Sequence, residues 1–244
     1  MRFASRDDGM TLVELMIGLG LLAMVLAFLL SALTHAQNDY VQQVDRVDSN
    51  DQLRAALQAM DHEIRSGDIL YSPSGEQYPA GCSGATCQAA PYYSFRVLSE
   101  TNVPAPRDEK RCVQFRVTSV GLLQRRDWDP NWTNSNDPVQ VTGWRTLASG
   151  VLNYPGAPAP YNTPSSYPFT RPSYGGAPAA NLVFINLWVN PHPGNGVITG
   201  RISAINGQIS ISGRNSAITT DLQQCGPQPP DPALFAGGAR VPPY

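Results

Sequence analysis

The stretch "GMTLVELMIGLGLLAMVLAFLLSAL", residues 9–33, decides the fold, because it is almost entirely apolar and yet carries one carboxylate, Glu14. From Leu15 to Leu33 the only polar side chain is that of Ser31. A helix over these positions is about 28 Å long, close to the ~30 Å hydrocarbon core of a bilayer. The stretch therefore predicts a membrane-spanning helix.

Glu14 needs a separate explanation. An ionisable group costs about 2.5–3.5 kcal/mol at the middle of a bilayer and somewhat less near its edge, so it normally has a partner. Residues 10–13 are neutral, and we find no local partner for the carboxylate among them. A free α-amino group would serve, and cleavage after Gly9 would create one.

Two simpler interpretations of the apolar stretch compete. It could be a plain signal anchor that holds a soluble domain outside the membrane. It could also be a cleaved secretory signal, since Thr34 and Ala36 before Gln37 loosely match a small-residue cleavage site. The apolar run is longer than a signal peptide requires, and neither interpretation explains Glu14.

Residues 9–14, Gly-Met-Thr-Leu-Val-Glu, resemble the prepilin-type cleavage and methylation motif of type IV pilins and type II secretion pseudopilins. The resemblance implies that Gly9 is the last residue removed by a prepilin peptidase and that Met10 becomes the N-methylated first residue. It also implies that Glu14 pairs with the free amine of a neighbouring subunit as helices stack in a filament. Such a pair compensates desolvation and sets register more than it adds stability.

Other parts of the sequence refine the resemblance. The leader, residues 1–9, is short and weakly positive, and Met10 stands where major pilins commonly have Phe. Retention of Glu14 argues against the tip-most, K-type pseudopilin. The ending "SISGRNSA", with Arg214 and Asn215, resembles W-type minor pilins and J-type pseudopilins.

Residues 34–66 continue with a helical period and are expected to form the amphipathic half of one long helix whose first half is residues 10–33. The apolar stripe consists of Leu53, Leu57, Met60 and Ile64. This half should pack on a globular head, while the first half lies in lipid and later in a filament core. Fraying or a kink is expected at the polar residues 49–51, and the helix is expected to stop at Gly67. A coiled-coil stalk is disfavoured because the heptads are not sustained.

Residues 67–224 turn to a strand pattern and are expected to form a β-rich head. The candidate strands are "YYSFRVLS", "CVQFRVT", "VGLLQRR", "VQVTGWRTL", "NLVFINLWV" and "RISAINGQISIS". Asn206-Gly207 is a hairpin signal. Consecutive strands after one helix predict an α+β fold, an antiparallel sheet laid on the helix stripe, and this too is pilin-like.

Residues 153–180 form a Pro/Tyr-rich interval that predicts an exposed loop without regular structure. Its tyrosines could form a contact surface for another subunit, or the interval could be a tolerated insertion; they are Tyr154, Tyr161, Tyr167 and Tyr174. Residues 225–244 are Pro-rich and are expected to be loose unless Cys225 ties their start to the sheet.

The four cysteines all follow the apolar stretch, which fits disulfides in an oxidising compartment better than a zinc site. A local clasp between Cys82 and Cys87, with a long-range staple between Cys112 and Cys225, is the preferred pairing. The sequence leaves the other pairings open.

The sequence shows no catalytic constellation, and we expect neither an enzyme nor an obligatory cofactor. A net charge of -2 and a pI of about 5.9 make nucleic acid an improbable partner. One loop alternates oxygen ligands as calcium loops do, and calcium is found in some pseudopilins; the candidate ligands are Asp127, Asp129, Asn131 and Asp137. Arg125 and Arg126 beside Trp128 and Trp132 are an alternative surface for single-stranded DNA.

The resemblance implies a filament subunit rather than a catalyst. Such a subunit spans the cytoplasmic membrane once, with its head outside, and then enters an extracellular or periplasmic filament. Its partners would be other pilin subunits, the prepilin peptidase, the assembly platform and, before assembly, membrane lipid. The size and irregular loops favour a minor pilin that primes or caps assembly, with a secretion or competence pseudopilin as the alternative. A membrane-anchored or secreted β-domain that binds a ligand or surface is the contrasting hypothesis.

Overall fold

The computed structural model describes residues 11–76, 91–100, 110–130, 141–171, 173–174, 177–178, 182–190 and 204–213, together with Cys225 and Pro229. The chain divides into two compact units, Met1–Asp45 and Arg46–Tyr244. One helix, α1 (Leu12–Ser66), contributes to both of them.

Helix α1 is a single α-helix of 55 residues. No proline interrupts it, and its polar residues 49–51 are helical, so the predicted fraying at that point is wrong. The helix ends at Ser66, as predicted from Gly67. A Cβ atom at Gly67 would overlap the side chain of Val97, so this glycine allows the chain to turn closely against the neighbouring strand.

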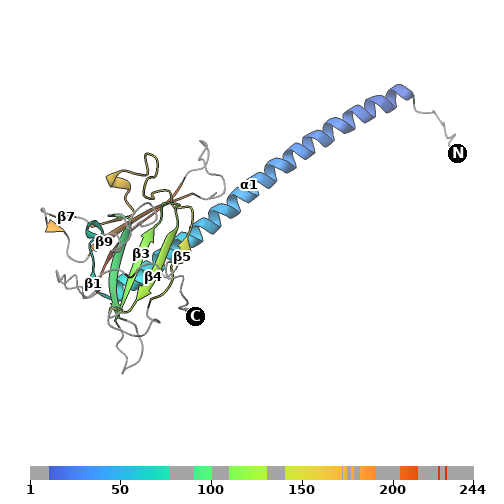
Figure 1. Ribbon diagram of the computed structural model, residues 1–244. Helices are drawn as coiled ribbons and strands as arrows, with labels where there is room; N and C mark the ends of the chain where they lie inside the picture. The colour runs from blue at the N-terminus through green and yellow to red at the C-terminus, as the bar shows by residue number, and fades with distance from the viewer. Residues whose placement is uncertain are drawn as a thin grey trace. The chain divides into compact units, whose positions relative to one another are not determined.

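The head contains two main antiparallel sheets (Figure 1). The larger one has the order β1-β2-β3-β4-β5 and consists of β1 (Gly67–Leu70), β2 (Ser94–Glu100), β3 (Lys110–Val117), β4 (Leu123–Trp128) and β5 (Arg145–Ala148). The smaller one has the order β10-β9-β6 and consists of β6 (Phe169–Thr170), β9 (Leu182–Val189) and β10 (Ile205–Ser212). A two-stranded ribbon pairs β7 (Ser173–Tyr174) with β8 (Ala177–Pro178), and two 3₁₀ turns are η1 (Pro73–Gly75) and η3 (Pro164–Ser166).

The C-terminal part of α1 packs against these sheets, which confirms the predicted α+β, pilin-like fold. Leu53, Met60 and Ile64 of the predicted stripe are at most 3% exposed, and Leu57 is partly buried against the same core. Ala56 is also buried, although a pattern of large apolar residues does not mark it. The residues of both main sheets that face the helix form the larger apolar cluster with it, and a second, smaller cluster contains Cys112, Trp128 and Cys225.

The Asn206-Gly207 pair does not form the predicted hairpin. Strand β10 runs through it without interruption and pairs with β9 from Ile205 opposite Val189 onward. A Cβ atom at Gly207 would lie 2.8 Å from Cδ2 of Leu53. The glycine is therefore needed for the close approach of the helix to the strand, and not for a turn.

The Pro/Tyr-rich interval, residues 153–180, contains η3, β6, β7 and β8, so the prediction of a region without regular structure is wrong. Asn153 is fully buried and fastens the interval to β9. Its Nδ2 donates to the carbonyl oxygens of Ser166 at 2.7 Å and Asn186 at 2.6 Å, and its Oδ1 accepts from the Trp188 backbone N–H at 3.0 Å.

Three of the four tyrosines of this interval contact their own head. Tyr167 stacks on Tyr92 with ring centroids 4.8 Å apart, and Tyr161 meets Trp188 edge-on at 5.8 Å. Tyr154 packs against the main core. The side chain of the fourth, at position 174, lies outside the described residues. Internal packing thus accounts for much of the aromatic surface that the sequence offered to a partner.

A disulfide joins Cys112 of β3 to Cys225, which is the long-range pairing preferred from the sequence. Both cysteines are fully buried. Cys82 and Cys87 lie outside the described residues, so their pairing stays a prediction. Of the C-terminal residues 225–244, the structure describes only Cys225 and Pro229.

Candidate functional site

The apolar part of α1 lies in the first unit, and its described residues are exposed along its whole length. Every described residue from Thr11 to Val44 is exposed. The large apolar side chains from Leu12 to Leu33 are 50–75% exposed. Burying one such side chain is worth about 1.5–3 kcal/mol, so this segment leaves tens of kcal/mol of apolar surface unsatisfied in water. It requires lipid or the apolar surface of other chains.

Among the described residues α1 is the one helix that is long and apolar enough to cross a membrane. One polar side chain at the end of its apolar part is bonded within the helix. The Thr34 hydroxyl donates to the Ser31 carbonyl oxygen at 2.8 Å. A hydroxyl that is bonded within its own helix can stay in a hydrocarbon environment at low cost.

Glu14 lies in the first turn of α1 and does have a local partner, which corrects the expectation from the sequence. Its Oε2 accepts hydrogen bonds from the Thr11 backbone N–H at 3.2 Å and from the Thr11 hydroxyl at 3.1 Å. The Glu14 backbone N–H in turn donates to Thr11 Oγ1 at 3.3 Å. This is the reciprocal arrangement of a capping box, and the sequence signal for it is a threonine three residues before a glutamate. Gly9 and Met10 lie outside the described residues, so their processing stays a prediction.

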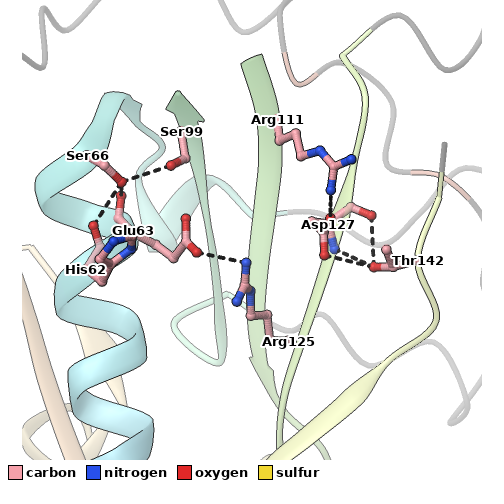
Figure 2. Close-up of polar contacts among 8 residues, drawn as sticks. All are labelled: His62, Glu63, Ser66, Ser99, Arg111, Arg125, Asp127 and Thr142. Atoms are coloured by element: carbon pink, nitrogen blue, oxygen red, sulfur yellow. Dashed lines mark hydrogen bonds and ion pairs between the residues drawn. The ribbon is translucent and has the colours of Figure 1, made fainter. Parts of the chain in front are cut away.

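The carboxylate of Asp127, the first candidate calcium ligand, is bonded within the sheet (Figure 2). Its Oδ2 accepts from Nη1 of Arg111 at 2.9 Å and its Oδ1 accepts from the Thr142 hydroxyl at 3.1 Å. Asn131 and Asp137 lie outside the described residues, and Asp129 follows the end of β4. Within the described part of the chain no three acidic, histidine or cysteine side chains are grouped to hold a metal ion. Calcium binding stays an untested prediction.

The arginines considered for single-stranded DNA are used inside the head. Arg125 forms an ion pair with Glu63, from Nη2 to Oε1 at 2.8 Å, and so ties α1 to β4 (Figure 2). Arg126 is 2% exposed and Trp128 is 1% exposed. Side chains that are buried in this way cannot stack on bases. The predicted surface for single-stranded DNA is therefore wrong for Arg126 and Trp128.

A buried ion pair, which the sequence did not predict, lies on the face of the larger sheet opposite α1. Arg96 Nε donates to Glu76 Oε1 at 2.8 Å, and the Glu76 side chain is fully buried. Burial raises the pKa of the Glu76 carboxyl above its ordinary value, and the Arg96 charge opposes that rise.

The same face holds the described C-terminal residues. Arg96 Nη1 donates to the Cys225 carbonyl oxygen at 2.8 Å, and Arg126 Nη1 donates to the Pro229 carbonyl oxygen at 2.9 Å. The Cys225 backbone N–H donates to the Tyr71 hydroxyl at 3.0 Å. Both Cys225 and Pro229 are buried. These charges therefore fasten Cys225 and Pro229 to the sheet, and they have the geometry of a structural support rather than of a reactive site.

Comparison with known proteins gives one match. Residues 4–30 match a family model described as the prokaryotic N-terminal methylation motif. No curated protein is significantly similar to the chain, and no solved structure is. The matched motif supports a membrane-anchored precursor of the type IV pilin or pseudopilin kind and points to a structural filament subunit.

Proposed function

We propose that the protein is a minor subunit of a type IV pilin-like filament, cut after Gly9 and methylated on Met10 before assembly. One observation carries the proposal. The methylation motif at residues 4–30 coincides with the start of a helix whose described residues from Thr11 to Val44 are all exposed. A plain anchor explains the exposed apolar surface but not the motif.

The physical logic of the assembly concerns what replaces lipid around α1. Lipid tails are as apolar as leucine side chains, so transfer of the helix from lipid into a filament core gains little hydrophobic free energy. A specific polar contact has to set position and register. We assign that contact to Glu14, which would meet the free amine of Met10 in a neighbouring subunit.

The proposed sequence of events fixes the partners and the location. The precursor crosses the cytoplasmic membrane once, with the head outside. A prepilin peptidase then removes the leader, and an assembly platform moves the mature chain into an extracellular or periplasmic filament beside other pilin subunits.

The head favours a minor role over that of a major building block. It follows a long helix with two main sheets and an extended Pro/Tyr-rich interval, in a chain of 244 residues. We propose that it primes or caps a pilus. A minor pseudopilin of a secretion or competence system would use the same N-terminus, and detection of the protein in sheared surface filaments separates the pilus from the periplasmic alternative.

The first test is the N-terminal residue and its mass on protein extracted from the membranes of its own host. A chain that starts at N-methylated Met10 supports the proposal. A chain that starts at Gln37 would instead be a secreted domain, and one that starts at Met1 would be a simple anchor. Either of the last two results contradicts the proposal.

The second test is Glu14→Ala. The variant should still be cut after Gly9, but its incorporation into filaments should fall at least about tenfold, because losing one charge-assisted hydrogen bond costs about 1.5–3 kcal/mol. Immunoblots of sheared filaments and of membranes measure the two quantities. Normal incorporation of Glu14→Ala would count against the proposed role of this carboxylate.

A further inference from the structure

We propose that Thr11 is a positioning residue for Glu14, which holds one oxygen of the carboxylate and leaves the other for the incoming amine. The inference rests on the proposed function and adds a residue to it. Both bonds that the carboxylate accepts from Thr11 end on the same atom, Oε2. Among the described residues none donates a hydrogen bond to Oε1.

These hydrogen bonds explain how the Glu14 carboxylate can be accommodated at the membrane before a neighbouring subunit supplies its amine. An unpartnered carboxylate at the edge of the hydrocarbon is costly, and donors from the same helix turn reduce that cost. Thr11 supplies two of them, its backbone N–H and its hydroxyl. These donors lower the cost of holding Glu14 near the hydrocarbon while the subunit is still a monomer.

The same bonds leave the carboxylate able to accept a stronger donor. Their lengths, 3.1 and 3.2 Å, are at the long end for hydrogen bonds, and both donors are neutral. A bond from an ammonium group to a carboxylate is roughly twice as strong as a neutral one. Because Oε1 is the free atom, the amine can add to the capping box instead of breaking it.

Positioning also lowers the cost of docking. A free glutamate side chain must give up rotamer freedom when it pairs, and that loss subtracts from the strength of the contact. The bonds from the Thr11 backbone N–H and hydroxyl fix the Glu14 side chain back along the first turn of α1 beforehand. Removal of the hydroxyl should therefore weaken assembly without changing the charge of Glu14.

The experiment compares Thr11→Val, which keeps the shape and loses the hydroxyl, with Thr11→Ser, which keeps the hydroxyl. Incorporation into filaments is measured as the ratio of filament to membrane protein, and the N-terminal mass checks processing. We expect Thr11→Val to lower the ratio roughly fivefold, as for the loss of a helix cap, and Thr11→Ser to match the wild type. Helix content in micelles, measured by circular dichroism, should be the same in all three proteins.

Each other result overturns the inference. If Thr11→Val incorporates normally, or if Thr11→Ser fails equally, the hydroxyl does not position Glu14. If helix content falls together with incorporation, Thr11 is only a structural cap. Failure of the proposed function looks different, because wild-type chains would then not start at Met10 and Glu14→Ala would have no effect on location.

Discussion

The two parts of helix α1 share one helical backbone but differ in side-chain exposure and in side-chain pattern. From Thr11 to Val44 every described residue is exposed, whereas Leu53, Ala56, Met60 and Ile64 are at most 3% exposed. Within the first part, Leu15 to Leu33 is apolar all round except at Ser31, and the second part has one apolar stripe. A helix that is apolar on every side needs a non-aqueous environment, while a stripe needs one covering surface, which here is the two sheets. The pattern of the side chains, and not the helical backbone, therefore determines which surroundings each part of the helix requires.

The largest expected difference between the two parts comes from a matched pair of methionines. Met60 is fully buried in the head and Met24 is 70% exposed. Met60→Ala should lower the free energy of unfolding of the head by about 2–5 kcal/mol, because it leaves a cavity, and Met24→Ala should change it by less than about 0.5 kcal/mol.

Urea unfolding in detergent micelles, followed by tryptophan fluorescence, measures this difference. All tryptophans follow residue 66, so their signal reports on the head. Equal losses for Met60→Ala and Met24→Ala would show that the head depends on both parts of the helix alike and would remove the contrast.

A smaller effect is expected from a pair of glycines. A Cβ atom at Gly207 would press on Leu53, whereas a Cβ atom at Gly20 would meet nothing within 4 Å. Gly207→Ala should destabilise the head by about 1–3 kcal/mol through overpacking, and Gly20→Ala should leave it unchanged.

A double variant sharpens this second comparison. In the Gly207→Ala background, Leu53→Ala should cost less than it does alone, since it relieves the overlap that the added Cβ atom creates. Additive costs, measured by the same urea unfolding, would mean that the helix and β10 are not in tight contact at this point.

The smallest expected effect on stability comes from Glu76, the buried acid of the head. Glu14, at the start of α1, is by contrast exposed and bonded within its own helix turn. The pKa of Glu76 is raised by burial, so the folded head binds this proton more tightly than the unfolded chain. The free energy of unfolding should therefore fall as pH rises from the ordinary glutamate pKa through the raised value. Glu76→Gln removes this titration.

The measurement is the difference in unfolding free energy between the wild type and Glu76→Gln at several pH values. The wild type should be favoured most below pH 4.5, the ordinary value for the group, and should lose that advantage as pH rises. A difference that grows with pH would mean that Arg96 dominates over burial and that the carboxyl has a lowered pKa instead.

Local patterns in the sequence predicted much of the fold. The long helix, its stop before Gly67 and the strands around Phe95, Phe115 and Ile185 follow from periodicity and turn residues, and the structure contains them. The cap at the start of α1 could also be predicted, because a threonine three residues before Glu14 is a readable signal. A search restricted to charged partners overlooks it.

Two other errors came from positions where a distant contact overrides a local preference. Gly207 looks like a turn residue, but it lies in a strand because Leu53 packs over it. The Pro/Tyr-rich interval looks like a free loop, but buried Asn153 fastens it to β9 through two hydrogen bonds, with Asn186 and Trp188. Neither partner is near in sequence, so no local pattern reveals it.

The sequence by itself determined that this chain has a membrane-length apolar helix, a methylation motif at its start and an α+β head, because periodicity and motif spacing are local properties. Only the tertiary structure decided which charged side chains are buried. It also decided which elements pack over the apolar side chains. The Glu76–Arg96 pair and Cys225 meet on one sheet face although Arg96 and Cys225 are 129 positions apart in the sequence. Contacts of that range depend on how the strands are ordered, and burial and pKa follow from the packing that results.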